Sequence, residues 1–171
     1  MTDDASQAPA RPPLSALRSQ ADVAEAVRWL LRQALAHRAR RLTWVDPDFS
    51  IWPLGDPDVL ETLTAWLRLP QRRLVLVAHG YAQVERQHMR FVSWRRDWAH
   101  AIDAWSPSEG VEVRLPSLLF DDGSLCLQVF DSTHWRGRLS VDERAVRPWH
   151  DEIDALLQRC EAAFPVRQLG L

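Results

Sequence analysis

The sequence contains no lysine and no asparagine, so every basic side chain other than histidine is an arginine. Without lysine, the chain offers no Schiff-base amine, no lysine nucleophile and no lysine for a Walker-type phosphate loop. Glycine is also scarce, with six residues and no cluster that would form a phosphate-binding loop. These absences exclude lysine-based covalent catalysis and a Walker-type phosphate loop.

Cysteine is nearly absent as well, since Cys126 and Cys160 are the only two. Two cysteines in a chain of 171 residues fit a reducing compartment better than a disulfide-stabilised secreted protein. No spacing of cysteine and histidine resembles a zinc site, and we expect neither a metal nor a cofactor. No apolar run approaches the ~20 residues of a membrane span, and the N-terminus lacks the apolar stretch of a secretory signal. We therefore expect a cytoplasmic protein that does not enter a membrane.

The composition is that of a globular domain, with 46% hydrophobic and 26% charged residues. The 21 arginines are offset by 23 acidic residues. The net charge of −2 creates no general attraction for polyanions, so nucleic acid is not expected as a partner. Residues 1–17, which contain Pro9, Pro12 and Pro13, are expected to be a disordered lead. A single domain is expected at residues 18–171.

Helical and extended patterns alternate along this domain. Ser19 and the Asp56-Pro57 pair are typical helix starts. The apolar run at residues 74–78 is typical of a strand covered on both faces. A heptad-like apolar seam predicts one long helix from Gln83 to Trp105.

Further strands are expected at residues 42–45, 111–115 and 136–141, and a last helix after Asp142. Together these elements predict an α/β fold with a mixed, mostly parallel sheet and helices on both faces.

Residues 115–127 read as a strand, an Asp-Gly turn and a second strand. The segment has the spacing of the phosphodiesterase motif His-x-Lys-x4-Asp-Gly. With Asp122-Gly123 in the Asp-Gly position, Leu115 occupies the histidine position and Ser117 the lysine position. The frame of the motif is present, but two of its three chemical groups are replaced.

Several other short strings, taken together with this segment, carry a resemblance to a known family. They are Arg40-Arg41-Leu42, the loop 46–58 with Leu54-Gly55-Asp56-Pro57, His88, Asp121-Asp122-Gly123, and Val166-Arg167-Gln168-Leu169-Gly170-Leu171. In this order they resemble a bacterial family of single phospholipase D-like halves of unknown function, over residues 38–171. The resemblance implies a phospholipase D-like fold. In active members of that superfamily two halves each supply a His, a Lys and an Asp around one phosphate. Leu115 and Ser117 therefore imply that this activity is lost, and we lean against an enzyme.

Two histidines and one arginine stand out as candidate ligand-binding residues. His79 follows the buried strand, at the end of the sheet where open α/β folds place ligands. It is either a base or anion ligand near neutral pH or a plain solvent-facing strand end. His88 and Arg95 fall on the apolar seam of the long helix. They either line an internal anion pocket or extend to solvent and acidic partners.

The densest polar-aromatic cluster is His134-Trp135-Arg136-Gly137-Arg138. It is either a recognition loop for a phosphate or aromatic group, or an arginine-bearing edge strand that resists aggregation. Asp122 remains a candidate from the motif, although an Asp-Gly turn needs no functional reason. Trp52 and Trp135 are expected to be partly exposed and to contribute to a contact surface.

These observations leave three hypotheses of function. The first is a non-catalytic phospholipase D-like module that binds a protein, a second copy of itself or a small anionic molecule. The second is a phosphoryl-handling enzyme with relocated histidines. The third is a binder of nucleic acid or phosphometabolites that uses its arginines.

Overall fold

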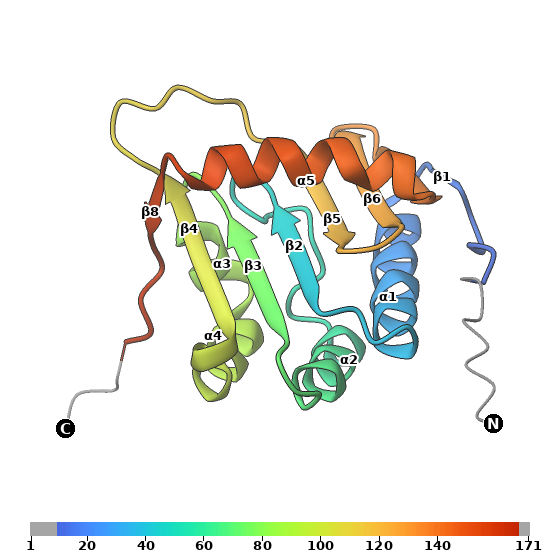
Figure 1. Ribbon diagram of the computed structural model, residues 1–171, viewed down its shortest axis with the longest axis horizontal. Helices are drawn as coiled ribbons and strands as arrows, with labels where there is room; N and C mark the ends of the chain where they lie inside the picture. Colours follow the sequence, from blue (N-terminus) through green and yellow to red (C-terminus); the bar gives the residue numbers. More distant parts are fainter. Residues whose placement is uncertain (1–9, 168–171) are drawn as a thin grey trace.

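The computed structural model describes residues 10–167, in which eight strands form one open sheet (Figure 1). The strands are β1 (Ala16–Leu17), β2 (Arg41–Val45), β3 (Arg73–Val77), β4 (Ile102–Pro107), β5 (Ser117–Asp121), β6 (Leu125–Asp131), β7 (Arg136–Val141) and β8 (Cys160–Ala162). The helices are α1 (Gln20–Ala36), α2 (Pro57–Leu67), α3 (Ala82–Gln87), α4 (Met89–Asp97), the 3₁₀ turn η1 (Ala99–Ala101) and α5 (Glu143–Leu157). The strand order is β1-β7-β6-β5-β2-β3-β4-β8.

The sheet is mixed, as predicted, but it is mostly antiparallel rather than mostly parallel. Within residues 10–167, only the β2–β3 and β3–β4 pairings are parallel, and the other five are antiparallel. Parallel neighbours need a long crossover, and here α2 and the α3–α4 segment provide one each. The strands β5, β6 and β7 follow one another through short turns, which can only give antiparallel pairs.

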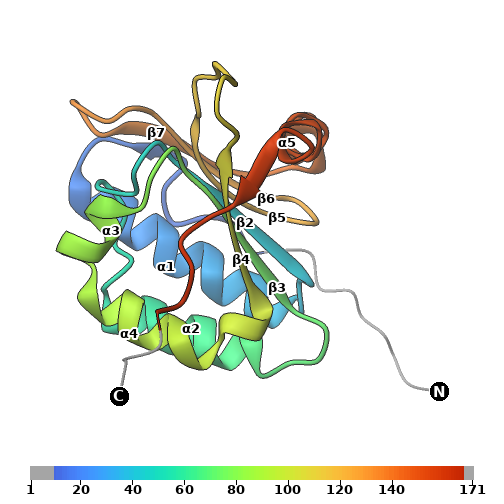
Figure 2. The ribbon, with the colours of Figure 1, turned by 90° about the vertical axis from the view of Figure 1, so that its left-hand side faces the viewer.

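Helices cover both faces of the sheet, as the sequence predicts. In Figure 2 the helices α1 to α4 lie on one face and α5 lies on the other. The strand β3 has buried side chains on both sides, because Leu74 and Leu76 belong to the larger core and Val75 and Val77 to the smaller one. The larger core packs against α1 to α4, and α5 closes the smaller one through residues such as Ile153.

The predicted helix starts are confirmed by their capping bonds. The hydroxyl of Ser19 accepts a hydrogen bond from the backbone N–H of Asp22 at 3.1 Å. The carboxylate of Asp56 accepts one from Asp58 at 2.8 Å, with Pro57 in the first turn of α2. Asp142 caps α5 in the same way. Each cap satisfies a backbone donor that the first helical turn would leave free.

The prediction of one long helix from Gln83 to Trp105 is wrong. The segment breaks at His88, whose backbone leaves the helical region with φ −122° and ψ 50°. It then ends at Asp97, and Ile102–Pro107 forms β4 beside β3. The heptad spacing of the apolar residues suits a helix, but Ile102 and Ala104 are buried by strand alternation instead.

Three smaller predictions also differ from the structure. Residues 111–115 form no strand, and Ala16–Leu17, placed in the lead by the sequence, pair with β7 as β1. Trp52 is buried rather than partly exposed, with 1% of its surface accessible. Residues 1–9 of the predicted lead and the last four residues of the terminal string lie outside the described residues.

Candidate functional site

The loop between β2 and α2 is organised by one buried carboxylate. Asp46 is 3% exposed and accepts bonds from the backbone N–H groups of Asp48 and Phe49, at 3.0 and 2.7 Å. It also accepts bonds from the indole N–H of Trp52 at 3.0 Å and from the hydroxyl of Ser117 at 2.5 Å. Four donors around one carboxylate fix the loop against β5, which explains why Trp52 is buried.

His88 holds the same loop from the opposite side. Its Nε2 lies 3.0 Å from the carbonyl oxygen of Phe49, which has a left-handed backbone with φ 62°. A carbonyl can only accept, so Nε2 carries the hydrogen, and Nδ1 is the acceptor when the ring is neutral. Nδ1 has no hydrogen-bond partner among residues 10–167, and a Cβ on Gly55 would lie 3.8 Å from it.

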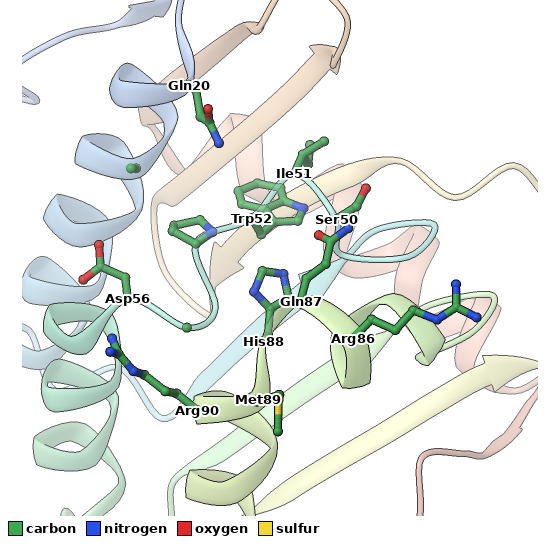
Figure 3. A pocket seen from close by; sticks show the side chains of 13 residues that line it. Gln20, Ser50, Ile51, Trp52, Asp56, Arg86, Gln87, His88, Met89 and Arg90 are labelled. Carbon is green, nitrogen blue, oxygen red and sulfur yellow. The ribbon is translucent and has the colours of Figure 1, made fainter.

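His88 lines a pocket of about 590 Å³ between the start of α1, the loop 50–56 and the α3–α4 junction (Figure 3). We call it the His88 pocket. Its other walls include Gln20, Trp52 and Met89, and Figure 3 shows Arg86 and Arg90 on either side of His88. Both arginines are exposed, and neither has a carboxylate within 4.0 Å in the described part of the chain. The pocket thus combines a buried imidazole with two arginines that make no ion pair in the described residues.

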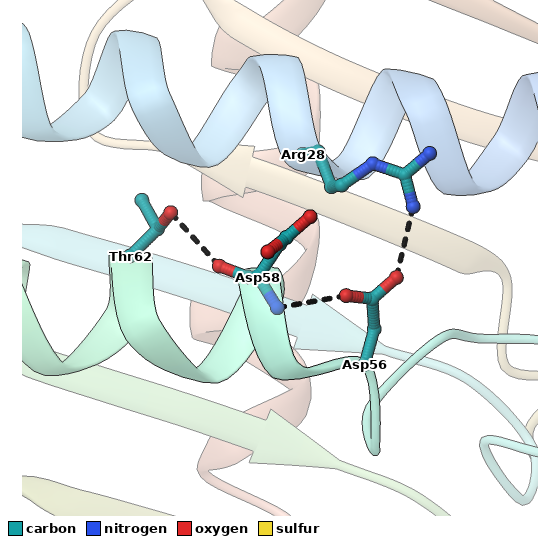
Figure 4. A network of polar contacts seen from close by, with 4 residues as sticks. All are labelled: Arg28, Asp56, Asp58 and Thr62. Atoms are coloured by element: carbon teal, nitrogen blue, oxygen red, sulfur yellow. Dashed lines mark hydrogen bonds and ion pairs between the residues drawn. The ribbon is translucent and has the colours of Figure 1, made fainter.

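The one acid in the pocket wall is already neutralised. Asp56 pairs with Arg28 of α1 at 2.8 Å and caps α2 with its other oxygen, as Figure 4 shows. This network ties α1 to the start of α2. It also leaves the carboxylate little free charge with which to repel an anion.

A second hollow lies at the end of the sheet where β2 and β3 finish. It has a volume of about 490 Å³, and its walls include His79, Arg114, Ser117, Gln128, Trp149 and Glu152. We call it the sheet-end hollow. Leu115 and Ser117, which the sequence resemblance assigns to the histidine and lysine positions of the motif, both line it. Leu115 is 3% exposed and packs in the smaller core, and Ser117 is bonded to Asp46. Neither side chain offers the chemistry of the motif.

The structure places the remaining candidate residues apart. Asp122 lies at the far end of β5 from Ser117, where its carboxylate accepts a bond from the backbone N–H of Arg40. Arg95 is buried on α4 and lines a different cavity from the one that His88 lines. The break at His88 separates the two side chains that the helical seam would have aligned.

The cluster at residues 134–138 forms the β6–β7 turn and the start of β7. His134 pairs with Asp131 at 2.9 Å, and this hydrogen bond lowers the pKa of the Asp131 carboxyl. Trp135 is half-buried and packs against the larger core, with a positive φ of 56°. Arg138 is paired in register with Gln128, so their side chains share a face of the sheet at the edge of the sheet-end hollow.

Sequence reasoning missed Arg86 and Arg90 as site residues, and it missed Asp46 as the residue that orders the loop. The string Arg86-Gln87-His88-Met89-Arg90 carries a usable signal, because two arginines flank a histidine symmetrically. In a continuous helix Arg86 and Arg90 would share one face and His88 would lie on the opposite face. Only the break at His88 brings them to one pocket.

No protein-family model and no curated protein sequence matches this chain. Among solved structures it is similar to phosphatidylserine synthase from Haemophilus influenzae Rd KW20, with a TM-score of 0.52 and 10% identity over 81% of this chain. The fold is phospholipase D-like. It is also similar to TrmBL2, an archaeal chromatin protein with a novel mode of DNA binding, with a TM-score of 0.59 and 8% identity over 86% of this chain.

Both similar structures are longer than this chain, which covers 36% of the synthase and 52% of TrmBL2. At these identities the likeness concerns the fold alone. Within residues 10–167, no helix has the length and apolar character needed to span a membrane. The same residues hold no group of three or more His, Cys, Asp or Glu side chains that could bind a metal ion.

Proposed function

We propose that this protein is a non-catalytic phospholipase D-like module that binds a small anionic molecule in the His88 pocket. The observation that carries the proposal is the unpartnered Nδ1 of His88. The side chain is 9% exposed, its orientation is fixed by Phe49, and the free nitrogen faces a wall residue of the pocket. Nδ1 is not among the fully covered atoms, so it is open to the pocket and offers an oriented acceptor to a molecule bound there.

The surroundings of His88 define the chemistry of that ligand. Arg86 and Arg90 favour a phosphate or carboxylate group, because guanidinium groups bind such oxyanions through paired N–H donors. When the His88 ring is neutral, its Nδ1 accepts, and a hydroxyl or N–H group of the ligand is the donor that suits it. A volume of about 590 Å³ lies within the range of ordinary small-molecule sites. A hydroxylated phosphate or carboxylate meets all three conditions.

Loss of catalysis is supported by the sheet-end hollow. Leu115 has no ionisable group, and Ser117 donates its hydrogen to Asp46. Because the chain has no lysine, a second copy of it cannot supply the missing amine either. Hydrolysis of bis(p-nitrophenyl) phosphate that disappears in the His79→Ala variant would instead support the phosphoryl-handling alternative.

The proposal is tested by calorimetric titration with glycerol 3-phosphate, which carries both a phosphate and hydroxyl groups. Glycerol and inorganic phosphate serve as probes that each carry one of the two features. We expect glycerol 3-phosphate to bind more tightly than either. The Arg86→Ala/Arg90→Ala variant should weaken binding at least about tenfold, since each charge-assisted bond contributes ~1.5–3 kcal/mol.

Two further variants separate binding from folding. His88→Gln keeps an amide donor for Phe49 but removes the acceptor at Nδ1, and Gly55→Ala places a methyl group beside Nδ1 without a clash. Both should fold and bind glycerol 3-phosphate more weakly. Arg144→Ala/Arg147→Ala on α5 removes the same charge elsewhere and should bind normally. Equal affinity in all these variants, or no binding by the unaltered protein, would contradict the proposal.

One observation favours nucleic acid as a second candidate ligand. Arg136 and Arg138 are exposed and lie on the same face of β7, and Arg138 pairs in register with Gln128, which lines the sheet-end hollow. If these arginines bind the phosphate backbone of a nucleic acid, a fluorescent single-stranded oligonucleotide should bind in a salt-dependent way. The Arg136→Ala/Arg138→Ala variant should bind it more weakly. Absence of binding at low salt would remove this candidate.

A further inference from the structure

Arg95 is a buried cation without an acidic partner. It is 6% exposed, and no carboxylate of residues 10–167 lies within 4.0 Å of its guanidinium group. One terminal nitrogen, Nη2, donates to the carbonyl oxygen of Phe164, and the guanidinium carbon lies 4.1 Å from the centre of the Phe164 ring. These contacts orient the group but do not neutralise its charge. A buried charge that lacks a counter-charge is strongly destabilising, so such a group normally has an anionic partner.

Two atoms of this guanidinium remain without a hydrogen-bond partner. Nε is fully covered and has none. The other terminal nitrogen, Nη1, also has no hydrogen bond in the described residues, yet it is not among the fully covered atoms. Nη1 is therefore the donor that remains open to the cavity that Arg95 lines.

That cavity has a volume of about 170 Å³, and we call it the Arg95 cavity. Arg96 and Arg167 also line it, and both are exposed, while Glu85 is the one acidic residue in its wall. Water occupies ~30 Å³ per molecule, so the space holds a few waters or one small oxyanion. It is below the ~300 Å³ at which pockets for organic ligands usually begin.

The cavity is closed on one side by an ordered part of the C-terminal segment. Phe164 has a left-handed backbone with φ 51° and stacks on Tyr81, with ring centres 4.7 Å apart and planes at 6°. Tyr81 in turn donates its hydroxyl hydrogen to the carbonyl of Trp105 at 2.9 Å. Arg95 and Phe164 thus sit in a fixed aromatic frame, which keeps the open donor in place before any ligand binds.

We infer that the Arg95 cavity is a second anion site, separate from the His88 pocket, that takes one free inorganic oxyanion of the size of phosphate. Arg95 donates from inside the cavity through Nη1, and Arg96 and Arg167 approach the same anion from the rim. The bound anion supplies the counter-charge that Arg95 lacks, and it links α4 to the segment that follows β8.

The test is an NMR titration of the full chain with inorganic phosphate, at constant ionic strength maintained with chloride. We expect saturable shifts of the backbone amides of Arg95, Phe164 and Val166. Thermal unfolding measured in the same buffers should show a midpoint that rises with phosphate, because a ligand that binds only the folded state stabilises it. The Arg96→Ala/Arg167→Ala variant should bind phosphate at least about tenfold more weakly.

Three comparisons make the result decisive. The Arg144→Ala/Arg147→Ala variant has the same charge change on α5 and should keep the phosphate response. The Arg86→Ala/Arg90→Ala variant should also keep it, which separates this site from the His88 pocket. Arg95→Met should abolish it, and if that variant fails to fold, the Arg96→Ala/Arg167→Ala variant still provides the test. A response that survives in Arg96→Ala/Arg167→Ala, or is lost only in Arg86→Ala/Arg90→Ala, would overturn the inference. So would shifts that follow chloride as well as phosphate.

Discussion

The hydroxyl of Ser117 donates to the carboxylate of Asp46 across a distance of 2.5 Å. The sequence resemblance assigns Ser117 to the lysine position of the phosphodiesterase motif. Asp46 orders the loop that forms a wall of the His88 pocket. Ser117 is therefore part of the structural support of the neighbouring His88 pocket.

This contact predicts a graded loss of stability. Ser117→Ala removes one of four donors to Asp46 and should lower the free energy of unfolding by about 1 kcal/mol. Asp46→Ala leaves four donors without their acceptor and should cost at least ~3 kcal/mol. Urea denaturation measures both changes, with the exposed Ser132→Ala as the control. Equal stability of Asp46→Ala and the unaltered protein would refute the role given to Asp46.

The first strand depends on a glycine opposite it. A Cβ on Gly137 would lie 2.5 Å from the carbonyl oxygen of Gln128 and 2.9 Å from Cδ1 of Leu17. Gly137→Ala should therefore cost roughly 1–3 kcal/mol and loosen β1 from β7. Gly80→Ala is the matched control, because a Cβ there meets nothing within 4 Å. Urea denaturation and amide exchange at Leu139, which bonds to Ser15, report the two effects.

The buried carboxyl of Asp121 makes the free energy of unfolding depend on pH in a predictable direction. Burial raises the pKa of its carboxyl above the ordinary value of 3.8, although two backbone N–H bonds oppose the shift. The folded state therefore binds this proton more tightly than the unfolded state. As pH rises from the unfolded value through the raised folded pKa, this group's contribution to the free energy of unfolding falls.

The Asp121→Asn variant isolates that contribution, because asparagine can still accept from Gly123 and Leu125. We expect the difference in unfolding free energy, variant minus unaltered protein, to grow from about pH 4 upward and then to level off. Urea titrations at several pH values measure it, with the exposed Asp151→Asn as a reference. A difference that is constant across this range would contradict the prediction.

The two cysteines should differ in reactivity. Burial raises the pKa of the Cys126 thiol to about 12, and it raises the pKa of Cys160, which is less buried. At pH 8 only ~10⁻⁴ of Cys126 is thiolate, the form that reacts with disulfide reagents. Labelling of the native protein with a chromogenic disulfide should modify Cys160 first. In Cys160→Ser the remaining thiol should react only as fast as the fold opens, and rapid labelling of that variant would count against the burial of Cys126.

Much of the fold follows from local patterns that the sequence states directly. The caps at Ser19, Asp56 and Asp142 depend on the residue itself and its next few neighbours. The apolar run of β3 depends on burial at every position. The Asp-Gly turn that joins β5 to β6 depends on two adjacent residues. Local sequence patterns also identified His79, His88 and Arg95 as polar residues in unusual positions. These patterns did not show which of the three share a pocket.

The sequence by itself excluded lysine chemistry, because a chain without lysine lacks that amine in any fold. The tertiary structure decided where the polar residues meet. The hydrogen bond from His88 to Phe49 joins residues 39 positions apart. It occurs where the helix breaks at His88, a break that the heptad spacing did not predict. The bond from Ser117 to Asp46 spans 71 positions. Hydrophobic periodicity cannot predict contacts between residues so far apart in the sequence, since these contacts form only when distant segments pack together.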